Sequence, residues 1–219
     1  MIMDFQDFLQ IVPYLKEINL PGEEAHAIMA PRERLKIIEN LNFEQLNPKN
    51  AGVMMLFYPK AKKTHLVLIV RNSYKGVHSS QIAFPGGKYE VDDLSLEQTA
   101  LRETFEEVGI PSDKIEILKA FTNLYIPPSN FMVYPFLGIC KEEITFYPDP
   151  IEVADIIELP LTVFLSDVIV VDADITTSYA NSIAVPVFKI DEHIVWGATA
   201  MMLSELKIAL NSVLNKINF

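Results

Sequence analysis

The sequence contains very little cysteine: Cys140 is the only one among 219 residues. A single cysteine excludes an intramolecular disulfide framework and a zinc site built from several cysteines. It also agrees with a reducing compartment, where thiols stay free. Because Cys140 lies in an apolar run, we expect it to be buried rather than catalytic.

Positive charge is also scarce. Lysine and arginine number 18 against 29 aspartates and glutamates, which gives a formal net charge of −11. This balance argues against a protein that coats nucleic acid, because such proteins neutralise phosphates with basic side chains. It leaves open a small substrate that carries phosphates, since bound cations can reverse the local field.

Long hydrophobic runs are absent. Apolar stretches such as residues 66–70 and 131–140 are shorter than the roughly 18–20 residues that cross a bilayer. The first residues include Asp4 and Asp7 and no basic segment, so we expect no signal peptide, no membrane contact and a cytoplasmic protein. Half of the 219 residues are hydrophobic, which at this length predicts a single domain. Because the pattern changes after residue 41, we expect the main part of the domain at 43–219 and an N-terminal extension, residues 1–42, packed on it.

The spacing of apolar residues predicts an alternation of helices and strands. We expect helices at residues 3–19, 95–108 and 198–215, and a helix or an extended lead-in at 32–41. We expect strands at residues 52–58, 64–70, 82–84, 114–123, 132–139, 154–159 and 184–190. Strands before, between and after two long helices predict an α/β sandwich with a mixed sheet.

The expected helix at 95–108 has recognisable ends. Ser95 is a candidate N-cap and Gln98 follows three residues later, as in a capping box. Gly109 suits the position after the last helical residue, and Pro111 prevents continuation. The loop before this helix, at residues 86–94, begins with a pair of glycines after Pro85, which allows a sharp turn and a close approach of backbone to a ligand.

Three carboxylates lie together on this helix. With Glu103 at 0°, Glu107 falls at about 40° and Glu106 at about −60°. The opposite side, at about 140° to 200°, carries apolar residues that we expect to face the core: Leu101, Phe105 and Val108.

These carboxylates repel one another and lie near the helix C-terminus, the unfavourable end for anions. A hard divalent cation such as Mg²⁺ or Mn²⁺ offsets the repulsion, because these ions prefer oxygen ligands. The alternative is a solvated acidic face without a metal. Arg102, beside this face, can hold a carboxylate with two hydrogen bonds.

The glycine pair and the sequence RETFEEVGI at residues 102–110 resemble the Nudix box. The interval from Gly87 to Arg102 is one residue longer than in the usual box, and Asp92 or Asp93 is the nearest counterpart of its first glutamate. Thr104 replaces the usual aliphatic residue. The resemblance implies a Nudix-type α/β/α sandwich with a catalytic loop-helix-loop.

The longer box is similar to that of the coenzyme A pyrophosphatase branch of the Nudix family. That branch has an upstream motif that Arg71, His78, Gln81 and FPGG at residues 84–87 match in register, while Asn72 and Ser80 depart from it. The resemblance implies that Arg71, His78 and Gln81 bind substrate. It also implies metal-dependent hydrolysis of coenzyme A or its derivatives, giving 3′,5′-ADP and 4′-phosphopantetheine or its acyl form.

The resemblance also implies roles for the acidic residues. Glu103 and Glu107 are the principal ligands of Mg²⁺ or Mn²⁺, with Glu106 and the Gly86 carbonyl as further ligands. Glu152 is a candidate fourth ligand or general base, and a solvated loop acid is the alternative. The catalytic set expected is then Arg102, Glu103, Glu106, Glu107 and Glu152.

Other interpretations stay open. Arg71 and His78 could make structural hydrogen bonds instead of binding phosphate. The substrate could be another nucleoside diphosphate derivative, such as ADP-ribose or a dinucleotide, and a module that binds a nucleotide without turnover is an alternative of another class. We expect a small-molecule diphosphate as partner, no nucleic acid, and leave a homodimer open.

Overall fold

A computed structural model describes residues 4–39, 41, 46–72, 81–177 and 180–217. The six helices named in it are α1 (Phe5–Glu17), α2 (Glu23–Ile28), α3 (Arg32–Glu39), α4 (Leu96–Val108), α5 (Leu161–Leu165) and α6 (Gly197–Lys216). Short 3₁₀ turns cover Ser112–Lys114, Pro127–Ser129 and Asp167–Ile169. No helix in these described ranges is long and apolar enough to cross a membrane.

Two sheets are formed by the described residues. The larger contains β1 (Lys49–Lys60), β2 (Lys63–Arg71), β3 (Ile82–Ala83), β4 (Gly86–Lys88), β5 (Glu116–Ala120), β6 (Leu124–Ile126), β7 (Phe131–Ile139) and β8 (Val153–Pro160). The smaller contains β9 (Val170–Thr177), β10 (Ala180–Ile190) and β11 (His193–Val195). In the larger sheet β1 is parallel to β7 and antiparallel to β2 and β4, so the expected mixed sheet is confirmed.

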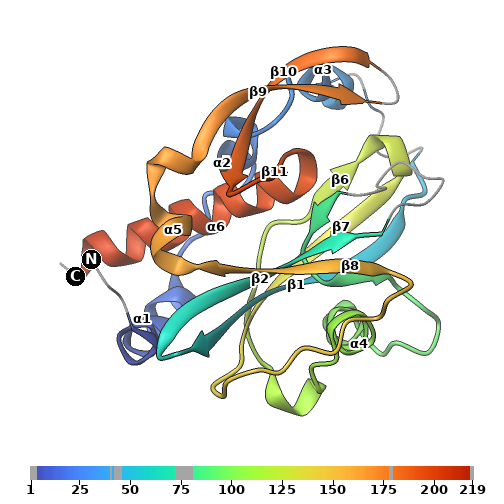
Figure 1. Ribbon diagram of the computed structural model, residues 1–219. Coiled ribbons are helices and arrows are strands. Elements are labelled where there is room, and N and C mark those ends of the chain that lie inside the picture. The colour runs from blue at the N-terminus through green and yellow to red at the C-terminus, as the bar shows by residue number, and fades with distance from the viewer. Residues whose placement is uncertain (1–3, 40, 42–45, 73–80, 178–179, 218–219) are drawn as a thin grey trace.

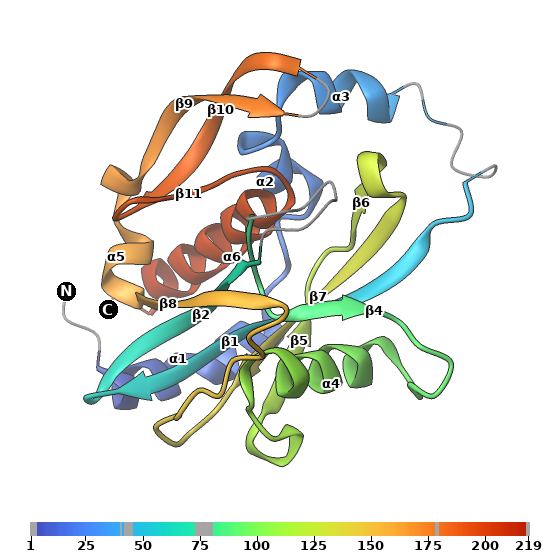
Figure 2. The same ribbon diagram turned by 45° about the vertical axis from the view of Figure 1, so that its right-hand side comes forward.

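The helices lie on both faces of the larger sheet. Figure 1 and Figure 2 both show α4 on one side of the sheet and α6 on the other, with the smaller sheet beyond α6. The α/β fold with a mixed sheet between helices, predicted from the alternating pattern, is therefore confirmed. Helices α2 and α5 and the strands β4, β6, β9 and β11 were not predicted, because they are short or lack a clear period in the sequence.

The two faces of the sheet form two separate cores. Along β1, Met55 and Phe57 face the core under α6, while Met54 and Leu56 face the core under α4. Successive side chains of a strand point to opposite faces, so a strand covered on both sides needs a continuous apolar run. The apolar run of β1 follows from its central position in the sheet.

The N-terminal helices belong to the core beneath α6. Phe8 of α1 is fully buried, and its ring centroid lies 4.8 Å from that of Phe57 in β1. Pro13 lies inside α1 without ending it. Cys140 is buried, as predicted.

A buried carboxylate joins α2 to α6. Glu205 accepts hydrogen bonds from His26 Nε2 at 3.2 Å, Gly22 N at 3.1 Å and Thr122 Oγ1 at 2.6 Å. Burial acts to raise the pKa of Glu205, but the hydrogen bonds from His26 and Thr122 prevail and hold the pKa below its ordinary value. His26 thus has a structural role in this contact.

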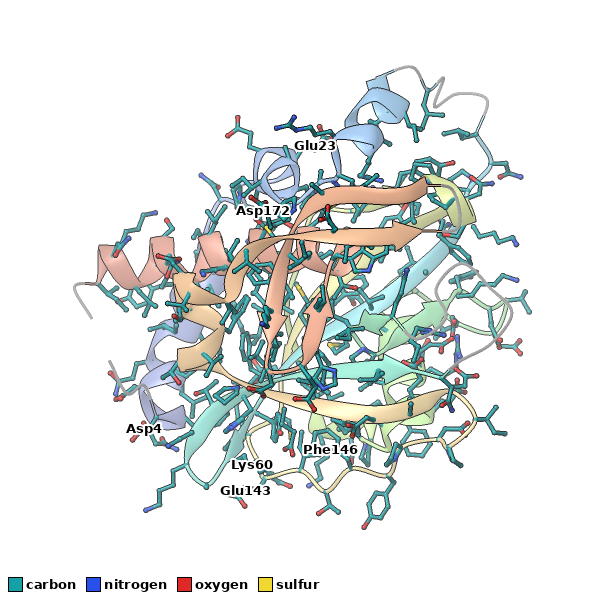
Figure 3. The ribbon with its side chains drawn as sticks, turned by 45° about the horizontal axis from the view of Figure 1, so that its top comes forward. Asp4, Glu23, Lys60, Glu143, Phe146 and Asp172 are labelled. Carbon is teal, nitrogen blue, oxygen red and sulfur yellow. The ribbon has the colours of Figure 1, made fainter. Side chains whose placement is uncertain are left out.

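The chain between β7 and β8 runs back along the α4 side of the sheet. At its start, Glu143 accepts a hydrogen bond from Ala61 N in the β1–β2 turn at 3.0 Å, beside Lys60 (Figure 3). Phe146 packs edge-on against Tyr58, with ring centroids 5.5 Å apart. These contacts direct the following residues, up to Glu152, toward the C-terminal end of α4.

Candidate active site

Helix α4 begins and ends where the sequence predicts. Ser95 is the N-cap and its side chain accepts a hydrogen bond from Gln98 N at 3.2 Å, while Gln98 Oε1 accepts one from Leu94 N at 2.9 Å. Gly109 ends the helix with φ of +77°, and its N–H donates to Phe105 O at 2.9 Å. A residue with a side chain would be strained at this φ.

The face of α4 that meets the sheet differs from our expectation. Phe105 is 54% exposed, so its prediction as a core anchor is wrong; Leu101 is half-buried and Val108 is buried as expected. The buried residues are Thr99, Ala100, Thr104, Glu107 and Val108. A helical wheel gives the order of side chains around a helix but not the rotation of the helix against its neighbour.

Small residues explain this rotation. A Cβ on Gly52 of β1 would lie 2.4 Å from Leu96 O and 3.0 Å from Ala100 N, so the strand and the helix pack backbone against backbone. Thr104, which stands where the Nudix box usually has an aliphatic residue, is buried and its hydroxyl donates to Ala100 O at 2.6 Å. The close approach carries Glu107 inward with Thr104.

Glu107 is buried against the glycine loop and β2. Its side chain is 1% exposed, Oε2 accepts from Gly86 N at 2.8 Å, and Oε1 lies 3.2 Å from Arg71 Nη1. Burial raises the pKa of Glu107 to about 7; Gly86 and Arg71 act against the rise, and the nearby charges of Glu103 and Glu152 add to it. At neutral pH this carboxylate is poised between its two protonation states.

Glu103 lies directly over Gly87. A Cβ at Gly87 would lie 2.5 Å from the Glu103 carboxylate carbon, so only glycine leaves room for this side chain. Burial raises the pKa of Glu103, Arg102 lowers it, and Glu106 and Glu152 raise it further. The structure thus brings Glu103, Glu107 and Glu152 into one electrostatically coupled group.

Arg102 holds the acidic face together. Its Nη1 donates to Glu103 at 3.0 Å and to Glu106 at 2.8 Å, while Nε and Nη2 donate to the two oxygens of Asp93 at 2.9 and 3.0 Å. These contacts with Asp93 raise the pKa of Arg102 and lower that of Asp93. Glu106 is 54% exposed, which makes it the most accessible of the three helix carboxylates.

Asp93 is a site residue that we did not select from the sequence. Its carboxylate is 4% exposed and also accepts from Thr99 Oγ1 at 2.8 Å and Glu90 N at 3.0 Å. The available signal was its position as one of two acids nearest the missing first glutamate of the box. The bidentate contact fixes the Arg102 guanidinium and, through it, Glu103 and Glu106.

The remaining predicted residues reach the site from other elements. Arg71 is the last residue of β2 and lies beside Glu107. Its backbone N–H donates a hydrogen bond to the backbone carbonyl of Gln81 at 3.0 Å. Glu152 lies in the turn before β8, close enough to influence the pKa of Glu103 and of Glu107. His78 lies outside the described residues.

The donor set suits a hard divalent cation, although its carboxylates are not already gathered around a common centre. Within residues 4–39, 41, 46–72, 81–177 and 180–217, no three aspartate, glutamate, histidine or cysteine side chains converge as a metal site. Arg71 and Arg102 instead hold Glu107, Glu103 and Glu106 through ion pairs. Carboxylates whose pKa values are raised by burial and mutual charge are the groups that a divalent cation stabilises.

Comparison with known proteins agrees with this architecture. Residues 47–173 match the NUDIX domain family. The uncharacterized Nudix hydrolase NudL of Photorhabdus laumondii is 32% identical over 160 residues, which cover 73% of this chain and 84% of the relative. NudL of Citrobacter koseri is also 32% identical, over 78% of this chain and 87% of its own length.

A solved structure shows the same fold. The MutT/nudix family protein from Enterococcus faecalis aligns over 92% of this chain and 81% of its own, with 16% identity and a TM-score of 0.51. At this identity the likeness speaks for the fold alone. The family match covers more than half of the chain and includes the glycine loop, α4 and Glu152, so the chain belongs to the Nudix hydrolase family and is a pyrophosphohydrolase.

Proposed function

We propose that this enzyme hydrolyses the diphosphate bond of coenzyme A or its acyl derivatives. The products are 3′,5′-ADP and 4′-phosphopantetheine or its acyl form. The resemblance of the upstream motif to the coenzyme A pyrophosphatase branch supports this substrate, and the position of Arg71 in the structure is the observation that carries it.

Arg71, the first residue of that motif, lies among the carboxylates. Its Nη1 contacts Glu107 at 3.2 Å, and its buried Nε has no hydrogen-bond partner among the residues that the structure describes. A buried donor without a partner is costly, so a phosphate oxygen that accepts from it would stabilise the site. This supports a role for Arg71 in binding the diphosphate, together with Gln81 and His78.

Nudix hydrolases generally use divalent metal ions. In our proposal Glu103 and Glu107 are the principal ligands of Mg²⁺ or Mn²⁺, with Glu106 and the Gly86 carbonyl as further ligands. When bound, the metal supplies charge neutralisation of the diphosphate and activation of water. The carboxylates that it would engage are those now held by Arg71 and Arg102.

The protein's own groups have distinct tasks in this proposal. Arg102, fixed by Asp93, orients Glu103 and Glu106, and Gly87 leaves room for the Glu103 carboxylate. Glu152 acts at the same centre, as a further ligand or as the base that accepts a proton from the attacking water. The close packing of the β1 backbone at Gly52 against the backbone of α4 fixes the position of the helix that carries these groups.

A panel of diphosphates tests the substrate. The purified protein is incubated with Mg²⁺ or Mn²⁺ and with coenzyme A, dephospho-coenzyme A, ADP-ribose or a dinucleotide, and products are identified by mass. We expect 3′,5′-ADP from coenzyme A, and a lower kcat/KM for that substrate in Arg71→Lys. A higher kcat/KM for ADP-ribose or a dinucleotide than for coenzyme A overturns the proposed substrate but leaves the proposed metal site standing. If no diphosphate is hydrolysed, the result favours a module that binds a nucleotide without turnover.

A further inference from the structure

The side chain of Asn72 contacts the turn that carries Glu152. Asn72 follows Arg71 at the end of β2, and its Nδ2 donates to Pro150 O at 2.7 Å and to Ile151 O at 2.9 Å. Its backbone N–H donates to Glu152 O at 2.9 Å. Asn72 therefore contacts three consecutive carbonyl groups, the last of which belongs to Glu152.

The same turn is attached to α4 on its other side. Asp149 N donates to Glu107 O at 3.0 Å, and Asp149 accepts from Ile151 N through its side chain at 2.8 Å and from Glu152 N through its carbonyl at 3.2 Å. The turn thus spans the distance between the C-terminal part of α4 and the end of β2. Asn72 is its attachment on the β2 side.

A β-bulge lies at this junction. In the β2–β8 pairing Val70 is opposite Asp155, but Arg71 is opposite Val153, so Ala154 is an extra residue on β8. A bulge bends a strand and changes the direction of neighbouring side chains, and bulges are frequent beside active sites. Because the bulge interrupts the regular ladder, the position of Glu152 depends on contacts beyond the β2–β8 pairing.

We propose that Asn72 is a positioning residue that holds Glu152 at the catalytic carboxylates. The inference rests on the catalytic role proposed for Glu152. Arg71, the last residue of β2, then contacts Glu107, and Asn72, the residue after the strand, holds the turn of Glu152. Asn72 departs from the motif of the coenzyme A branch. In the structure its side chain contacts the turn of Glu152, which explains the departure by a role in this turn and not in substrate binding.

The contacts of Asn72 predict an effect on turnover more than on stability. Its hydrogen bonds lie at the exposed surface, where the loss of a neutral hydrogen bond changes stability little because water replaces the partner. A displacement of a catalytic group by about 1 Å can reduce turnover by up to about 100-fold. Substrate binding by other parts of the site is unaffected, so KM should change less than kcat.

A double-mutant cycle tests the proposal with the best substrate of the diphosphate panel. We expect Asn72→Ala to lower kcat about tenfold with less than about a twofold change in KM. In the Glu152→Gln background the same substitution should change kcat by less than about twofold, because both act through one carboxylate. Asn72→Ser, which keeps one donor, should lie between Ala and Asn. Asn123→Ala, at an exposed loop position, is the matched control and should keep wild-type kinetics.

The outcomes separate this inference from the function on which it rests. A tenfold loss of kcat on Asn72→Ala in both the wild-type and the Glu152→Gln backgrounds overturns the positioning role of Asn72. A wild-type kcat in Asn72→Ala does so too. Neither result affects the catalytic role proposed for Glu152. Wild-type kcat in Glu152→Gln removes the catalytic role of Glu152, and this inference with it. If Asn72→Ala does not fold, the Ser variant carries the same cycle, and additive losses there also overturn the positioning role.

Discussion

Replacing Glu107 by glutamine should stabilise the metal-free protein while it removes activity. The buried carboxylate has its pKa raised from an ordinary value of 4.5 to about 7. Each pKa unit corresponds to about 1.4 kcal/mol, so the ionised form costs the folded state about 3 kcal/mol. Glutamine resembles the protonated form, with one acceptor oxygen for Gly86 N and no charge, and does not carry this cost.

The stability that Glu107→Gln gains over the wild type should increase with pH. Between pH 4.5 and about 7 the folded protein binds more protons at Glu107 than the unfolded chain does, so wild-type stability falls as pH rises. The advantage of Glu107→Gln is therefore near zero below pH 4.5 and complete, at about 3 kcal/mol, above pH 7. For a chain of this size that corresponds to a rise in Tm of roughly 6–12 °C.

The assay is thermal or urea unfolding of both proteins in EDTA from pH 4.5 to 8.5, with turnover measured separately in Mg²⁺ or Mn²⁺. We expect the stability difference to grow with pH and kcat to fall by at least about 100-fold, because an amide is a poorer ligand for a hard cation. A variant that is no more stable at pH 8, or a difference that does not change with pH, refutes the reasoning and means that Arg71 compensates the buried charge fully. Near-normal kcat removes Glu107 from the metal site.

Four further substitutions test the packing of the site and of α6. Phe105→Ala should cost less than about 1 kcal/mol in urea unfolding, and Val108→Ala about 2 kcal/mol; the reverse order would place the other face of α4 against the sheet. Gly87→Ala should lower kcat at least about tenfold with a fold retained by circular dichroism, because its Cβ displaces Glu103, and an unchanged kcat contradicts that contact. Glu205→Gln should destabilise by roughly 3 kcal/mol in urea unfolding, because the amide nitrogen faces donors, and a loss below about 1 kcal/mol argues against the network.

The sequence by itself predicts the longer elements, such as α1, α4, α6, β1 and β2, and the acidic character of the site. The caps Ser95 and Gly109 and the spacing of Glu103 and Glu107 are local properties of one helix, so they are readable without tertiary contacts. The continuous apolar run of β1 likewise predicts a strand that is covered on both faces. The metal ligands, the cytoplasmic location and the homodimer stay predictions.

The tertiary structure decides which face of α4 turns inward and what holds each carboxylate. Phe105 faces outward and Glu107 inward because Gly52 of β1 admits the helix backbone closely, a contact between residues about 50 positions apart in the sequence. Glu107 meets Arg71, 36 positions away, and Asn72 meets the turn of Glu152, 78 to 80 positions away. A residue pattern records the period of a helix or strand, but the rotation and the partners of that element depend on the shape of the surface against which it packs.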